Sequence, residues 1–340
     1  MGIKDFIKNP LSKSISSITK DETSNYLKSD EGDLLTVDAK KLISEEIRLT
    51  ESIHHDECEN CSGLDKDDDN EDETLLEGEK IFSKLVIDWS EPLYNTSKIP
   101  KVHFIVPTSQ QDWKHDACQE KPGSVQDKIS NWCKANLEKY QKEDIGDGQT
   151  LTCSVTSLPI NIMDIEVMKN TKNNVLILPH FLWINDLHSS KVDETLNGLI
   201  PDLLSNNYDE KQLLSKHKNL SIAHEKAFVF ICSHTTRDKR CGVTAPYLKK
   251  MFDRKLQKYG LYRDNSDLRP DGVNVKFISH MGGHKFAGNV QIYLKETRTL
   301  IWLGRVTPKH VISLIDYLII QKEPTLPFPE KVRCIKKYKW

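Results

Sequence analysis

The stretch KAFVFICSHTTRDKRCGVTAPYLKKMFDRKLQKYG, residues 226–260, indicates the fold class of this chain more clearly than any other. Its first part, KAFVFICSH, is rich in aromatic and β-branched residues and predicts a buried strand. Its last part, TAPYLKKMFDRKLQKYG, predicts a helix with Pro246 in the first turn and Gly260 near the C-cap. The run GVNVKFIS (272–279) predicts the next strand. The alternation of strand and helix indicates an α/β layer.

The residues that follow complete a compact unit. The segments NVQIYLKE (289–296) and TLIWLGRV (299–306) resemble the two strands of a hairpin, and PKHVISLIDYLIIQ (308–321) predicts a closing helix. The resulting β-α-β-β-α order is the one that the core of a thioredoxin-like domain has.

A second α/β pattern precedes this unit. Strands are predicted at KVHFIVP (101–107) and NVLILP (174–179). Helices are predicted over residues 124–143, which have one apolar face, and over residues 191–205, with a break at Pro201. A polar segment then separates the two units, and we place the boundary near residue 218.

These patterns predict four parts of the chain. Residues 1–80 form a largely disordered acidic N-terminal region, because the run GLDKDDDNEDETLLEGE (63–79) packs like charges too densely to be buried. Residues 81–218 form an N-terminal α/β domain, and residues 219–325 form a thioredoxin-like domain. Residues 326–340 form a basic C-terminal tail.

Composition excludes several classes of function. The 340 residues have a formal net charge of −2, which gives no reason to expect binding to nucleic acid or to an anionic membrane. The N-terminus has no secretory apolar region, and no apolar run reaches transmembrane length, so we expect a cytoplasmic protein. In a reducing compartment the eight cysteines are not a disulfide framework, and closely spaced ones are candidates for metal or redox chemistry.

Four potential metal ligands follow the ends of two predicted strands. Cys232 and Cys241 are separated by eight residues, and His280 and His284 by three. If the two strands are neighbours in one sheet, two thiolates and two imidazoles converge at the same edge. This donor set suits either a tetrahedral zinc ion or a 2Fe–2S centre of the Rieske type, with two cysteines on one iron and two histidines on the other. The spacing alone leaves both open.

The stretches FICSHTTRDKRCGVTAPYL and FISHMGGHKFAGNVQIY resemble the fungal thioredoxin-like ferredoxins of the sucrase/ferredoxin-like family. The resemblance extends upstream and covers roughly residues 55–320. It implies a 2Fe–2S cluster held by Cys232, Cys241, His280 and His284, and single-electron transfer as the function. Because histidine ligands have a second ring nitrogen, we expect electron transfer coupled to proton uptake. The sequence has no dinucleotide-binding fingerprint, so a flavoprotein reductase is the expected electron donor.

Two further features have competing interpretations. Cys58 and Cys61 form a CxxC pair, which would serve a thiol-disulfide oxidoreductase, although the acidic residues beside it disfavour a reactive thiolate. The tail KVRCIKKYKW ends in Trp340, and this ending is similar to the aromatic signal that the cytosolic iron–sulfur targeting complex recognises. Lys339 departs from the small or acidic residue usual before that aromatic residue.

Overall fold

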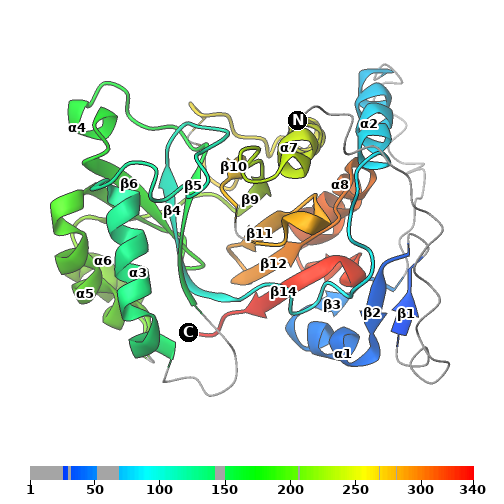
Figure 1. Cartoon of the computed structure of the whole chain (residues 1–340). Helices are drawn as coiled ribbons and strands as arrows, with labels where there is room; N and C mark the ends of the chain where they lie inside the picture. Colours follow the sequence, from blue (N-terminus) through cyan, green and yellow to red (C-terminus); the bar gives the residue numbers. More distant parts are fainter. Residues whose placement is uncertain are drawn as a thin grey trace.

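A computed structural model describes residues 26–29, 32–51, 69–141, 150–205, 207–267, 269–280 and 282–340. Its centre is a ten-stranded mixed sheet with helices packed against it, which confirms the predicted α/β class (Figure 1). In spatial order the strands are β14 (Val332–Lys337), β12 (Thr299–Leu303), β11 (Val290–Leu294), β9 (Ala227–Cys232), β10 (Val273–Ile278), β5 (Thr150–Thr156), β4 (Pro100–Pro107), β6 (Lys172–Leu178), β7 (Leu182–His188) and β8 (Leu220–Ile222).

The C-terminal part of the sheet follows the predicted order of elements. Strand β9 leads into helix α7 (Lys239–Lys258), and β10 returns beside β9 in parallel. Strands β11 and β12 then form the predicted antiparallel pair, and β11 lies along the other edge of β9. Helix α8 (Pro308–Leu314) follows and continues as a π-helical segment over Ile315–Ile320.

The N-terminal part of the sheet is built around β4, which pairs in parallel with β5 and antiparallel with β6. Helix α3 (Val125–Gln141) connects β4 to β5, and the short helix α4 (Ile165–Met168) follows β5. Helices α5 (Val192–Leu203) and α6 (Glu210–Lys216) lie between β7 and β8. Helix α5 runs through Pro201 to Leu203, so the predicted break there is wrong. Its apolar face is buried on both sides of Pro201, and this packing outweighs the lost hydrogen bond.

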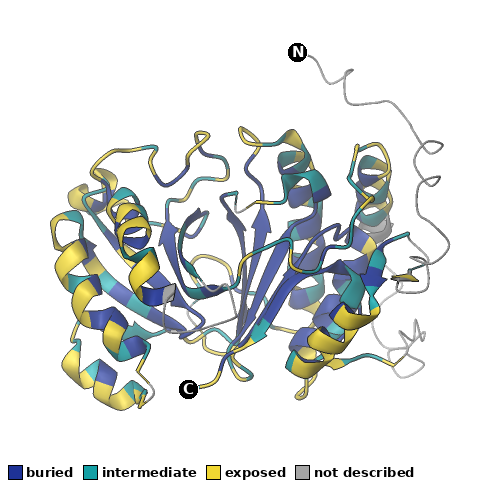
Figure 2. Cartoon of the chain, turned by 60° about the horizontal axis from the view of Figure 1, so that its bottom comes forward, coloured by how far each residue is buried: buried dark blue, intermediate teal, exposed yellow. Residues whose placement is uncertain are grey.

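The two parts of the sheet meet where β5 and β10 both end. Thr156 and Ile278 are the only residues of these strands paired in register, and Ser279 N donates to Val155 O at 2.9 Å. One sheet therefore continues across the boundary that we placed near residue 218, and β8, just beyond that boundary, pairs with β7. The strands of the sheet are mostly buried, whereas the helices that cover it have exposed residues on their outer side (Figure 2).

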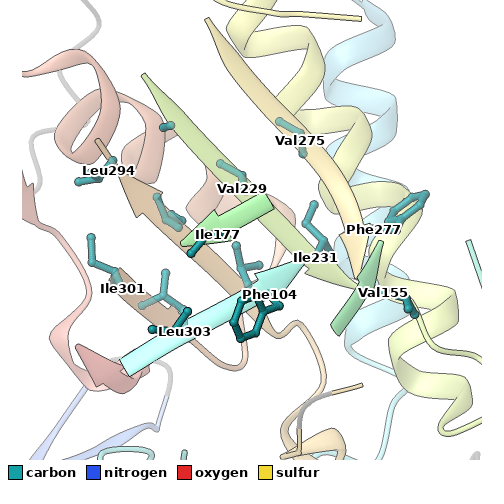
Figure 3. Close-up of a cluster of buried hydrophobic side chains, with 14 of the residues drawn as sticks. Phe104, Val155, Ile177, Val229, Ile231, Val275, Phe277, Leu294, Ile301 and Leu303 are labelled. Atoms are coloured by element: carbon teal, nitrogen blue, oxygen red, sulfur yellow. The ribbon is translucent and has the colours of Figure 1, made fainter. Parts of the chain in front are cut away.

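An apolar core accompanies the junction. Phe104 and Ile177 from the N-terminal part belong to the same buried cluster as Val229 and Ile231 from the C-terminal part (Figure 3). All four side chains are fully buried. Burial of a side chain of this size is worth about 1.5–3 kcal/mol, so this shared core holds the two parts together.

Regular structure also occurs within residues 1–80, which differs from the disorder predicted there. The described part contains β1 (Tyr26–Lys28), β2 (Leu34–Thr36), α1 (Val37–Glu46), β3 (Arg48–Leu49) and α2 (Asp69–Phe82). Thr36 caps α1 by accepting from Ala39 N, and Ile43 of this helix is fully buried. The acidic run thus contributes to a helix, and α2 packs against α7 and α8.

The segment predicted as a C-terminal tail, residues 326–340, includes the last residue of β13 (Thr325–Leu326) and all of β14, the edge strand beside β12. Buried charges hold this region to the N-terminal segment. Asp33 is fully buried between Arg305 Nη1 at 2.7 Å and Lys331 Nζ at 3.1 Å. No helix in the described ranges is long and apolar enough to cross a membrane.

Candidate functional site

The sheet brings the four predicted ligands to one edge. Cys232 is the last residue of β9, and His280 lies two residues beyond the end of β10. These strands are parallel and in register, with Cys232 opposite Ile278. The segments that follow the two strands therefore leave the sheet at the same place. His284 begins the short 3-10 turn His284–Phe286, which leads back into β11.

Cys241 reaches this edge from a helix. Helix α7 begins at Lys239, because the Asp238 side chain caps it by accepting from Arg240 N. Pro246 consequently lies inside α7, beyond its first turn. The hydroxyl of Thr244 donates to the carbonyl of Arg240 at 2.8 Å, so the helix has an additional bond just before the proline. This early start places Cys241 in the first turn of α7.

The two cysteines are buried and in contact. Cys232 is 6% exposed and Cys241 is fully buried. The thiol of Cys241 donates to the sulfur of Cys232, which holds the pKa of Cys232 well below its usual range, and the neighbouring His280 imidazole lowers it further. The same contact, together with burial, raises the pKa of Cys241. One of the two sulfurs is therefore predisposed to be a thiolate, the form that binds metals.

The two histidines form a second pair. Their ring centroids are 5.0 Å apart, and His284 Nδ1 lies 3.3 Å from His280 Nε2. Both residues are half-buried. Burial, and then the proximity of His280, lowers the pKa of His284, which favours the neutral imidazole that binds a metal.

One nitrogen of this pair lacks a protein partner. His280 Nδ1 is buried and makes no hydrogen bond. A buried polar atom without a partner costs about 1–3 kcal/mol. A bond from this nitrogen to a metal would remove that cost, so the atom fits the role of a ligand.

The donors lie as two pairs. Within the described residues, no group of three or more His, Cys, Asp or Glu side chains is already placed to hold a metal ion. The contacts found are cysteine to cysteine, histidine to histidine, and His280 to Cys232. The contact of His280 with Cys232 joins the two pairs, so the four donors lie together as either one tetrahedral centre or two neighbouring irons would require.

Known proteins resemble this chain over the region that contains the four side chains. The Sucrase/ferredoxin-like family matches residues 93–334, a range that includes all four side chains. The chain belongs to this family. It is 58% identical over 309 residues to actin patches distal protein 1 of Saccharomyces cerevisiae, a match that covers 91% of this chain and 95% of that protein.

More distant similarity reaches proteins named altered inheritance of mitochondria protein 32. The chain is 34% identical over 114 residues to that of Debaryomyces hansenii, covering 33% of this chain and 37% of the relative. It is 40% identical over 96 residues to that of Clavispora lusitaniae, covering 28% and 31%. These two matches span about a third of the relatives' length. No solved structure matches the chain.

Sequence patterns did not reveal His234, which connects the end of β9 with the start of the loop from His280 to His284. His234, two residues after Cys232, is 1% exposed, and its Nδ1 accepts from His280 N at 3.2 Å. Its Nε2 donates to the carbonyls of Trp113 and Lys114 at 3.0 and 2.9 Å. His234 is therefore a neutral bridge that fixes the start of the histidine loop against residues 113–114. The only sequence signal is its place just beyond a buried strand.

The remaining predicted residues lie elsewhere. Cys58 and Cys61 fall outside the described residues. Trp340 is half-buried. Its ring stacks on His180 with centroids 4.5 Å apart, and Arg298 lies over it and donates to its backbone oxygen.

Proposed function

We propose that this protein transfers single electrons through a 2Fe–2S cluster bound by Cys232, Cys241, His280 and His284. One observation supports this most strongly: two thiols and two imidazoles meet as contacting pairs where β9 and β10 end. In the proposed site the cysteines would hold one iron and the histidines the other, which is the Rieske-type division of ligands. The bound cluster would supply a centre that accepts and releases one electron.

The chain's own residues prepare the two sides differently. Cys232 and Cys241 are buried, so water is excluded from the anionic side of the site. His280 and His284 are half-buried, so the imidazole side faces the surface, where a redox partner has access. Electron entry through the histidine side follows from this difference in exposure.

The histidines add proton chemistry. Each imidazole that binds through one nitrogen keeps a second nitrogen, which holds or releases a proton as the charge of the site changes. Neutral imidazoles in place of thiolates also make the reduced site less negative, which raises its potential relative to a site with four cysteines. We propose that reduction is coupled to protonation of His280 and His284.

The alternatives predict different properties. A structural zinc site would hold the fold without redox activity, and the ferredoxin-like family to which the chain belongs favours the cluster over it. A thiol-disulfide oxidoreductase that uses Cys58 and Cys61 would keep its activity when His280 and His284 are replaced.

The proposed partners follow from this chemistry. A flavoprotein reductase is the proposed donor, since a flavin passes on electrons one at a time. Because Cys232 and Cys241 must stay reduced to bind iron, we propose the cytoplasm as the compartment.

We also propose that Trp340 is recognised by the cytosolic iron–sulfur targeting complex. The indole is half-buried, so part of its surface is open to a partner while His180 and Arg298 hold the remainder. Trp340→Ala should lower the iron content of protein made in cells and leave reconstitution in vitro unchanged. Equal iron in cells for both forms would contradict this role.

The ligands are tested by absorption in the visible range. The wild-type protein purified without oxygen should be red-brown, and Cys232→Ser, Cys241→Ser or His280→Ala/His284→Ala should each lose most of the colour. Cys118→Ser and Cys334→Ser, which also replace buried free cysteines, are matched controls and should keep it. A colourless wild type, or colour that survives the loss of both histidines, would overturn the proposal.

A further inference from the structure

A buried arginine lies beside the site without an ionic partner. Arg333, in β14, is 1% exposed, and within the described part of the chain it forms no ion pair with a carboxylate. Its hydrogen bonds all go to neutral oxygens: Gly282 O at 3.0 Å, Asn289 Oδ1 at 2.9 Å, Thr96 O at 2.8 Å and Thr96 Oγ1 at 3.2 Å. By comparison, the buried Arg305 is paired with Asp33 at 2.7 Å.

A buried cation without a carboxylate partner is expensive, because desolvation of a charge costs several kcal/mol. Burial lowers the pKa of Arg333 to about 10, and the nearby Cys334, Cys232 and Cys241 act in the opposite direction. The guanidinium therefore stays protonated at neutral pH. A fold that retains such a charge without a carboxylate is expected to use it for an anion that the protein binds or forms nearby.

The contacts of Arg333 show which site that anion would occupy. Gly282 and Gly283 lie between His280 and His284, and a Cβ placed at Gly283 would be 2.3 Å from Cζ of Arg333. Asn289, which accepts from Arg333, accepts through its own carbonyl from Cys232 N at 3.0 Å. A small cavity is lined by Cys232, Gly282, Asn289 and Trp302, and Arg333 contacts the last three of these residues.

We propose that Arg333 is a positioning residue of the redox site, which fixes the Gly282–Gly283 loop and stabilises the negative charge that reduction adds. This inference rests on the proposed function. With two ferric ions, two sulfides and two thiolates the site is neutral, and one electron from the flavoprotein donor makes it −1 until a histidine takes up a proton. A fixed positive charge nearby favours the reduced form and so raises the potential.

The test is the reduction potential of purified variants with intact clusters. Arg333→Gln removes the charge and keeps a hydrogen-bonding group, and it should make the potential more negative. We expect roughly a tenfold lower equilibrium constant for reduction, which corresponds to about 59 mV for one electron. Arg333→Lys keeps the charge, so its potential should stay close to that of the wild type, although an ammonium group lacks the planar arrangement of donors that a guanidinium has.

A second pair of variants keeps Arg333 in place. Thr96 is half-buried and accepts from Arg333 Nε, so Thr96→Asp sets a carboxylate against the guanidinium, and Thr96→Asn is its neutral match. The potential of Thr96→Asp should be more negative than that of Thr96→Asn. This pair gives a result even if Arg333→Gln does not fold.

The outcomes separate the two claims. A wild type without iron or visible absorption overturns the proposed function and this inference together. An iron-containing wild type whose potential is unchanged in Arg333→Gln, or equal in Thr96→Asp and Thr96→Asn, overturns the role of Arg333 alone.

Discussion

The guanidinium of Arg333 occupies the space where a side chain at position 283 would lie, with Cζ 2.3 Å from an ideal Cβ of that residue. Gly283→Ala should therefore displace the loop between His280 and His284 and reduce iron content to less than half. The four hydrogen bonds of Arg333 and its contact with the Trp302 ring prevent it from moving aside. Iron per chain, measured after reconstitution, checks this.

Gly282→Ala is the matched control. Both glycines have positive φ, +90° and +70°, so alanine at either position costs about 1–2 kcal/mol of backbone strain. Only Gly283 faces Arg333, because nothing lies within 4 Å of a Cβ at Gly282. Equal iron loss in both variants would show that backbone strain, and not the arginine, is responsible.

The buried triad of Asp33, Arg305 and Lys331 gives a prediction about stability. Asp33→Asn should lower the free energy of unfolding by about 3–5 kcal/mol, because two buried cations would lose their carboxylate. Glu51→Gln breaks an exposed pair with Arg48 at 3.7 Å and should change it by less than about 1 kcal/mol. Denaturant unfolding measures both, and similar losses would contradict the account.

His103 should make the protein sensitive to acid. Its side chain is fully buried between Tyr293 Oη at 2.7 Å and Ser154 Oγ at 3.0 Å, and burial lowers its pKa to about 3. The unfolded chain takes up a proton below about pH 6.5, which the folded chain does not. The stability that the neutral ring provides is thus present above about pH 6.5 and lost as the pH falls toward 3.

His103→Gln removes this titration. Between about pH 6 and 4 the free energy of unfolding of the wild type should fall more steeply than that of the variant, by about 1.4 kcal/mol per pH unit. Unfolding curves at several pH values give the two slopes. Parallel slopes would mean that His103 takes up its proton in the folded state.

The role of the imidazoles can be isolated by exchanging them for thiolates. His280→Cys/His284→Cys should keep iron and sulfide, lower the potential and lose most of its pH dependence. Potentiometric titration from about pH 6 to pH 10 checks this. A potential that still follows pH as the wild type does would assign the coupled proton to another group.

The meeting of the four side chains was predictable because it depends on local pattern. The apolar runs before Cys232 and after Gly272 indicate two strands, and parallel neighbours bring their ends together. The start of α7 was misplaced, because Pro246 resembles a first-turn residue and the Asp238 cap is a contact that only the folded chain reveals.

Contacts between distant segments were beyond sequence patterns. Arg333 meets Gly282 across 51 positions, and Asp33 meets Lys331 across 298. No spacing rule relates such residues, since the packing of β14 and of the N-terminal segment decides which of them are neighbours. For the same reason β14 was mistaken for a tail: its basic composition suggests exposure, but Arg333 and Cys334 are buried in the sheet.

The iron and acid-labile sulfide content of the full chain, purified without oxygen, decides whether the protein carries a 2Fe–2S cluster. We expect about two iron and two sulfide per chain, together with red-brown colour. One zinc ion per chain without sulfide, in a colourless protein, would contradict it.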